Sequence, residues 1–155
     1  MKALFYSMAL LISFSVWSCA PALVKPDFSV QDIELTGVSF SSIDLTFKVK
    51  IINPNPMGVN VEKLSYHVGL NDVELGSGEL LKPVFLNASD SQVVALPFSS
   101  SLIGMSKVAK LLLGEDAINY ELNGTVILSK FLVKQEFPFS SKGTVPIDRS
   151  TFHHH

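Results

Sequence analysis

The most regular pattern in the chain is a strict alternation of apolar and polar residues between Ile43 and Ile51. The odd-numbered positions are apolar, and the positions between them hold Asp44, Thr46 and two lysines. A period of two residues is typical of a β-strand that packs one face on a core. The pattern therefore predicts a half-buried strand, with a second strand before it around Ile33 to Leu35.

A double Asn-Pro sequence, Asn53-Pro54-Asn55-Pro56, ends this alternation, and Gly58 restarts the chain. The prolines cannot donate to a sheet ladder, and each favours an extended backbone in the asparagine before it. Asparagine amides can bond the backbone groups that such an interruption leaves without partners. We interpret Asn53, Pro54, Asn55, Pro56 and Gly58 as a structural motif, with direct ligand contact by the two asparagines as the alternative.

Further strands are predicted wherever alternation or a short apolar run is bounded by turn residues. Asn71-Asp72 predicts a two-residue hairpin turn, because both residue types tolerate the left-handed backbone. Pro97 predicts that its strand lies at a sheet edge. The predicted strands cover residues 59–70, 73–75, 83–86, 92–99, 118–128 and 133–139, with the last two joined at Ser129-Lys130.

One helix is predicted, capped at Ser99 to Ser101, with apolar residues at helical spacing from Leu102 to Leu112 and Gly114 after its end. About seven short strands with one helix favour a mostly β fold. The expected architecture is an antiparallel immunoglobulin-like or fibronectin III-like β-sandwich of about seven strands with one α-helix.

The composition of the 155-residue chain fits one folded domain, with 47% hydrophobic and 17% charged residues. The net charge of −2 comes without any block of lysine and arginine, so nothing in the sequence forms a phosphate-binding footprint. We therefore expect no nucleic-acid partner.

The first residues have the zones of a secretory signal: Lys2, an apolar run from Ala3 to Val16, and small residues before Ala20. The run is short for a membrane span, which needs about 20 apolar residues. Val16-Trp17-Ser18-Cys19 resembles a bacterial lipobox, and Cys19 is the sole cysteine of the chain. We expect lipidation of Cys19, with ordinary cleavage after Ala20 as the alternative.

The chain then divides into four parts. They are a signal peptide with lipobox (1–18), a lipidated cysteine with a Pro-bearing spacer (19–27), a folded domain (28–149) and a tail (150–155). The tail ends in His153-His154-His155, which is typical of an expression tag or its remnant but could also hold a metal.

No catalytic, cofactor-binding or metal-binding constellation is predicted. His67 stands alone on a strand and is interpreted as a solvated side chain rather than a base, since no nucleophile or carboxylate is spaced to partner it. The glycines at 76 and 78 lack the Lys-Ser or Lys-Thr of a phosphate loop. The apolar stretches 126–128 and 131–133 have apolar residues on both faces, so one face lies either under the helix or open as a groove.

The segment from Asn53 to Leu80, NPNPMGVNVEKLSYHVGLNDVELGSGEL, resembles the core motif of the type 2 late embryogenesis abundant domain, also called the water stress and hypersensitive response (WHy) domain. The resemblance extends over about residues 28–147. It implies a folded, non-enzymatic sandwich domain linked to desiccation and stress tolerance, without a cofactor.

Together these features predict a lipid-anchored protein of a bacterial cell envelope, on the outer membrane and facing the periplasm. Its partners would be the membrane, through the N-terminal lipid, and either an envelope protein or a hydrophobic ligand. The alternative is a carrier or sensor of a lipid or other hydrophobic molecule, which would use a groove beside the helix. An enzyme is the third hypothesis and lacks a constellation to support it.

Overall fold

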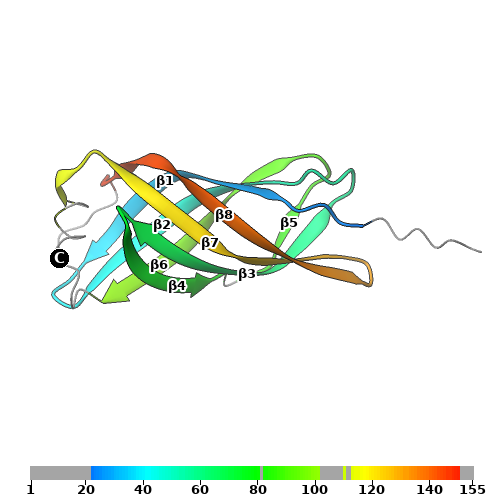
Figure 1. The fold of residues 1–155 in the computed structure, drawn as a ribbon, viewed down its shortest axis with the longest axis horizontal. Coiled ribbons are helices and arrows are strands. Elements are labelled where there is room, and N and C mark those ends of the chain that lie inside the picture. The colour runs from blue at the N-terminus through cyan, green and yellow to red at the C-terminus, as the bar shows by residue number, and fades with distance from the viewer. Residues whose placement is uncertain (1–21, 81, 102–109, 111–112, 151–155) are drawn as a thin grey trace, which may run out of the picture.

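The computed structural model describes residues 22–80, 82–101, 110 and 113–150, and within them the chain is built from eight β-strands (Figure 1). The strands are β1 (Asp27–Val38), β2 (Ser42–Ile52), β3 (Val59–Leu70), β4 (Val73–Glu79), β5 (Val84–Leu86), β6 (Ser91–Ser101), β7 (Ala117–Lys130) and β8 (Val133–Asp148). The mostly β fold predicted from the sequence is confirmed.

The strands belong to one continuous sheet rather than to the two separate sheets of the predicted immunoglobulin-like or fibronectin III-like sandwich. Their order is β4-β3-β7-β8-β1-β2-β6, with β5 pairing to β3 beside this path. The two halves are joined because the end of the long strand β8 leaves β7 and pairs in parallel with β1, at Ile33↔Ile147 and Glu34↔Asp148. Nearer the start of β1 the two strands are held by side chains, since the rings of Phe28 and Phe139 stack with centroids 4.2 Å apart.

The sheet is curled so that its two ends approach each other. The hydroxyl of Ser100 on β6 donates to the carbonyl of Leu75 on β4 at 3.0 Å. The Tyr66 hydroxyl on β3 donates across the interior to the carbonyl of Pro97 on β6 at 2.7 Å. Pro97 lies on an edge strand, as predicted, because β6 ends the strand order.

The predicted helix falls mainly on residues 102–112, of which the structure describes only Lys110. The residues predicted to cap it, Ser99 to Ser101, form the end of β6 and pair with Ser42 to Asp44 on β2. The helix that they would cap lies outside the described residues, so the cap stays a prediction.

The predicted hairpin at Asn71-Asp72 is confirmed, since both residues have positive φ angles, 45° and 64°, as a type I′ turn requires. Beyond it, Gly76 has a φ of 134°, and the ladder with β3 shifts register next to it, between Val68 and Gly69. This is the bulge that a glycine inside a strand predicts.

The core lies inside the curl and is formed by the inward positions of every strand. In β2 these are the five apolar residues of the alternation, all buried. Phe47 makes an edge-to-face contact with Phe98 on β6, with ring centroids 6.3 Å apart. These side chains account for the fold, because burial of one large apolar side chain stabilises by about 1.5 to 3 kcal/mol.

Tyr66 makes the stability of the protein depend on pH at the alkaline end. Burial raises the pKa of its hydroxyl to about 12, whereas an unfolded tyrosine loses its proton near pH 10. The contribution of Tyr66 to the free energy of unfolding is therefore fully present below about pH 10 and is lost as pH rises towards 12.

We expect Tyr66→Phe to lower the free energy of unfolding by about 1 kcal/mol at neutral pH and to reduce its fall at alkaline pH. Urea unfolding of both proteins at about pH 8 and pH 11 measures this difference. An equal loss of stability in the two proteins over that interval would show that Tyr66 does not carry the dependence.

Candidate functional site

The double Asn-Pro sequence lies at one end of the curled sheet, in the loop between β2 and β3. The inward positions of β2 continue through this loop, because Asn53 and Asn55 are 1% and 2% exposed while Pro54 and Pro56 face solvent. The apolar-polar alternation ends at Ile51, but the alternation of buried and exposed positions does not. Two amides thus occupy sites that in the strand belong to apolar side chains.

Asn53 bonds backbone groups of this loop and of the turn after β5. Its Nδ2 donates to the carbonyls of Met57 at 3.0 Å and Asn87 at 2.8 Å, and its Oδ1 accepts from the backbone N–H of Asn55 at 3.0 Å. The same Oδ1 accepts from Asn55 Nδ2 at 2.8 Å. The Asn53 side chain therefore connects its own loop to the turn after β5. Both its Oδ1 and its Nδ2 have two hydrogen-bond partners within the protein.

Asn55 holds the first described part of the chain. Its Oδ1 accepts the N–H of Val24 at 2.7 Å, and its Nδ2 donates to the carbonyl of Val24 at 2.9 Å, so that the amide pairs with Val24 as a neighbouring strand would. Leu23 beside it is buried in the core. The predicted spacer of residues 19–27 is therefore not a free linker over its whole length, because it docks on the domain from Leu23 onwards.

Gly58 completes the loop by allowing close approach of a side chain. A Cβ at this position would lie 2.4 Å from Cζ of Phe85 and 3.3 Å from the carbonyl oxygen of Leu86. A side chain at residue 58 would therefore push the Phe85 ring away. Asn53, Asn55 and Gly58 thus connect this end of the sheet to the N-terminal segment and to the residues of β5 and the turn after it.

A second cluster, which sequence reasoning missed, lies where β1 meets the end of β8. Carboxylate oxygens of Asp32, Glu34 and Asp148 lie within 4.8 Å of one another. Burial, followed by the neighbouring carboxylates, raises the pKa of Asp32 in spite of a backbone N–H donated by Ile33. Lys48 partly compensates the negative charge of this cluster, because its Nζ lies 3.3 Å from Oε1 of Glu34. The three residues come from strands that pair in parallel, which local patterns do not predict.

His67 is exposed on the outer face of β3, as its alternating position predicts. It borders an open hollow of about 690 Å³, together with Glu74, Asn119, Glu121 and Lys142. Among the described residues, no hydrogen bond joins His67 to a carboxylate or a hydroxyl. Most of the residues that line the hollow are polar or charged, and Val68, Val73 and Tyr120 add apolar surface to it.

The turn between β7 and β8 is not at Ser129-Lys130, which are the last residues of β7, but at Phe131-Leu132. Lys130 pairs with Val133 to close this two-residue loop. Both loop residues project into solvent, and Phe131 is 90% exposed. Of the two predicted apolar stretches, 126–128 packs partly into the core, whereas 131–133 is an exposed hairpin tip.

Cys19 and the terminal histidines lie outside the described residues, so their predicted roles stay predictions. The docking of Leu23 and Val24 was also missed. An apolar pair between two prolines is the only signal that could have indicated it. Within the described ranges, no helix has the length and apolar character needed to cross a membrane.

Comparison with known proteins links this fold to desiccation proteins of plants. The chain is 27% identical over 124 residues to the desiccation protectant protein Lea14 homolog of Glycine max, covering 79% of this chain and 82% of that protein. It is likewise 27% identical over 127 residues to a probable desiccation-related protein of Arabidopsis thaliana, covering 81% and 84%.

A solution structure of an Arabidopsis thaliana protein has the same fold, with a TM-score of 0.62 at 25% identity over 82% of this chain and 85% of that one. The family model described as late embryogenesis abundant protein matches residues 48–143, a range that includes the double Asn-Pro loop and most of strands β3 to β8. Since this match covers more than half of the sequence, the chain belongs to the late embryogenesis abundant protein family.

Proposed function

We propose that this protein is a non-enzymatic, lipid-anchored envelope protein whose domain, of the type 2 or WHy kind, binds or protects envelope components during drying and related stress. The bacterial lipoprotein setting, the signal peptide ending before Cys19 and an outer-membrane location facing the periplasm are parts of this proposal. The observation that carries it is the similarity over about 80% of the chain to relatives named as desiccation proteins.

The outer face of β7 and β8 fits a domain that stays folded when water is withdrawn. Its polar side chains bond one another across the strands, as in Thr144 Oγ1 to Asn119 Oδ1 at 2.6 Å and Ser140 Oγ to Asn123 Oδ1 at 2.6 Å. Lys142 and Glu121 form an ion pair at 2.9 Å between them. Groups that already have partners lose less when their hydration is removed.

The N-terminal junction fits a domain held by its first residues. Asn55 fixes the backbone of Val24 at two points, so a pull on the chain at Cys19 is transmitted to the loop and to β2. A diacylated cysteine remains on its membrane, because each buried CH₂ contributes about 0.8 kcal/mol.

The test is fractionation of bacteria that produce the wild-type protein or Cys19→Ala. We expect wild type in the membrane fraction and the variant in the soluble or culture fraction, because the variant has no sulfur to carry the lipid. Ser18→Ala, which keeps both the cysteine and a small residue before it, is the matched control and should remain on the membrane. If Cys19→Ala stays on the membrane and its mass differs from that of the wild-type protein only by the substitution, the lipid anchor is refuted.

A further inference from the structure

The tip of the β7–β8 hairpin exposes two large apolar side chains that the fold does not use. Phe131 is 90% exposed and Leu132 is fully exposed. Lys130 packs its ammonium over the Phe131 ring, with Nζ 4.7 Å from the ring centroid. Apolar groups of this size stabilise a protein only when they leave water, so their position has no benefit for the domain alone.

The backbone at Phe131 adds a second cost. Its φ angle is 53°, in the left-handed region that bulky residues rarely adopt. Phe131 is the first of the two loop residues. When this position of a two-residue hairpin has a positive φ, glycine is favoured there. A phenylalanine that is both exposed and in an unfavourable conformation points to a contact outside the fold.

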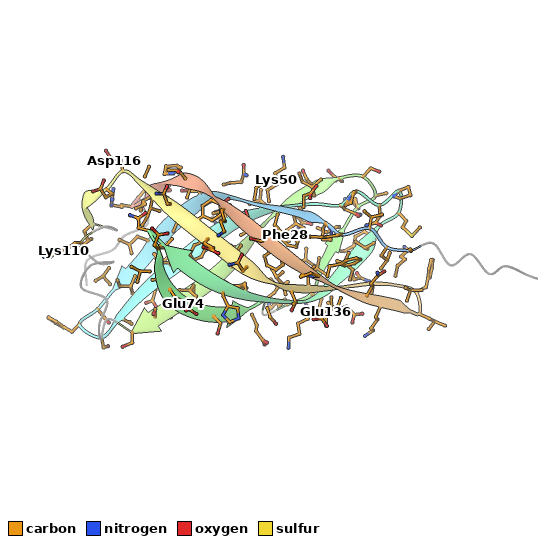
Figure 2. All side chains as sticks on the ribbon, viewed as in Figure 1. Phe28, Lys50, Glu74, Lys110, Asp116 and Glu136 are labelled. Atoms are coloured by element: carbon orange, nitrogen blue, oxygen red, sulfur yellow. The ribbon has the colours of Figure 1, made fainter. Side chains whose placement is uncertain are left out.

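The tip lies at the end of the molecule where the described chain begins. In Figure 1 the hairpin and the first described residues are at the right-hand end, and the loop between β1 and β2 is at the other end. Asp116, near the start of β7, is labelled at that other end in Figure 2.

The distance between Cys19 and this end of the domain is limited by the docking of the spacer. Leu23 is buried and Val24 is bonded to Asn55, so only four peptide units separate Cys19 from a fixed residue. Four residues span at most about 14 Å when fully extended. A lipid on Cys19 therefore keeps the hairpin end of the domain close to the headgroups.

We propose that Phe131 and Leu132 insert into the headgroup and acyl boundary of the bilayer that holds the lipid of Cys19. This inference rests on the proposed lipid anchor. Apolar residues at such a boundary bind reversibly in proportion to the area they bury, and a nearby lysine is attracted to anionic headgroups. Lys130 is placed for this role, because its ammonium lies over the exposed Phe131 ring, 4.7 Å from the ring centroid. The hairpin is thus a second membrane contact that fixes the orientation of the domain.

The matched comparison for this tip is Phe40, which is fully exposed in the loop between β1 and β2 at the opposite end. Cys19 is the sole cysteine, and lipidation occupies its sulfur. Leu132→Cys and Phe40→Cys therefore each give one free thiol in the lipidated full chain. Both take an environment-sensitive fluorophore at an exposed site, and circular dichroism verifies that each labelled protein is folded.

The test uses these two labelled lipoproteins in vesicles of phosphatidylcholine and phosphatidylglycerol. At position 132 we expect blue-shifted emission and about threefold stronger quenching by doxyl-labelled lipid than at position 40, since only the hairpin reaches the boundary. Water-like emission at both positions, or lipid quenching at 40 and not at 132, would overturn the proposal. Blue-shifted emission at 132 that doxyl lipid does not quench would assign the tip to a protein contact and overturn it as well.

The mass of each lipoprotein before reconstitution separates this result from the anchor itself. A chain that carries the lipid but keeps its hairpin in water disproves only the insertion. A chain without added lipid mass removes the proposed function, and the insertion that rests on it.

Discussion

Replacement of Asn53 by alanine is expected to lower the free energy of unfolding by about 3 to 5 kcal/mol. The reason is the number of hydrogen-bond partners that the substitution removes: the part-buried carbonyls of Met57 and Asn87, and the buried backbone N–H and side-chain amide of Asn55. Each buried group without a partner costs about 1 to 3 kcal/mol, and partial rearrangement reduces the sum. Urea unfolding followed by circular dichroism measures the difference.

Asn87→Ala is the matched control for this prediction. Asn87 is in the turn that Asn53 reaches, but its own side chain is exposed and makes one long bond of 3.4 Å to Asp90. Its backbone carbonyl, which accepts from Asn53, remains in the variant. We expect a change of about 0.5 kcal/mol or less. Equal effects of the two substitutions would mean that the buried amide network does not hold this end of the domain.

Gly124→Ala is the second substitution with a large expected effect, because it places a methyl group between two paired strands. A Cβ on Gly124 in β7 would lie 2.0 Å from the carbonyl oxygen of Ser65 and 2.9 Å from Cα of Tyr66, both in the backbone of β3. Backbone atoms cannot rotate away as a side chain can, so β3 and β7 must separate. We expect a loss of about 3 kcal/mol or more in the free energy of unfolding.

Gly69→Ala tests whether that loss comes from the contact or from the change of residue type. Gly69 pairs with Glu121 in the same β3–β7 ladder, and a Cβ there would have no neighbour closer than 3.6 Å. Its substitution should be nearly neutral or slightly stabilising, since alanine loses less conformational entropy on folding. A thermal unfolding scan of both variants gives the comparison, and a Gly69→Ala loss as large as that of Gly124→Ala would argue against the steric account.

Local patterns predicted the strands and some of the turns, because these depend on neighbouring residues. The alternation from Ile43 to Ile51 is β2, and Asn71-Asp72 is a turn. The turn at Phe131-Leu132 could not be predicted in the same way, since neither residue favours a positive φ. It is set by the pairing of the strands on either side.

The global arrangement was less accessible to sequence reasoning. The single curled sheet depends on two residue pairs between β1 and β8, which are more than 110 positions apart in the chain. Similarly, an asparagine amide is polar, so Asn53 and Asn55 end the alternation of apolar and polar residues. In the structure they nevertheless continue the alternation of buried and exposed positions. Only their bonds to Met57, Asn87 and Val24 reveal why they are buried.

We propose that the domain is attached to a membrane through Cys19, with the end that contains Asn53, Asn55 and the β7–β8 hairpin towards the lipid. The most direct measurement is the mass of the N-terminal peptide of the mature protein, extracted from the bacterial membrane and digested. We expect a chain that begins at Cys19 and carries the added mass of acyl chains on that residue. A mature chain that begins after Ala20, or an unmodified Cys19 peptide, would contradict it.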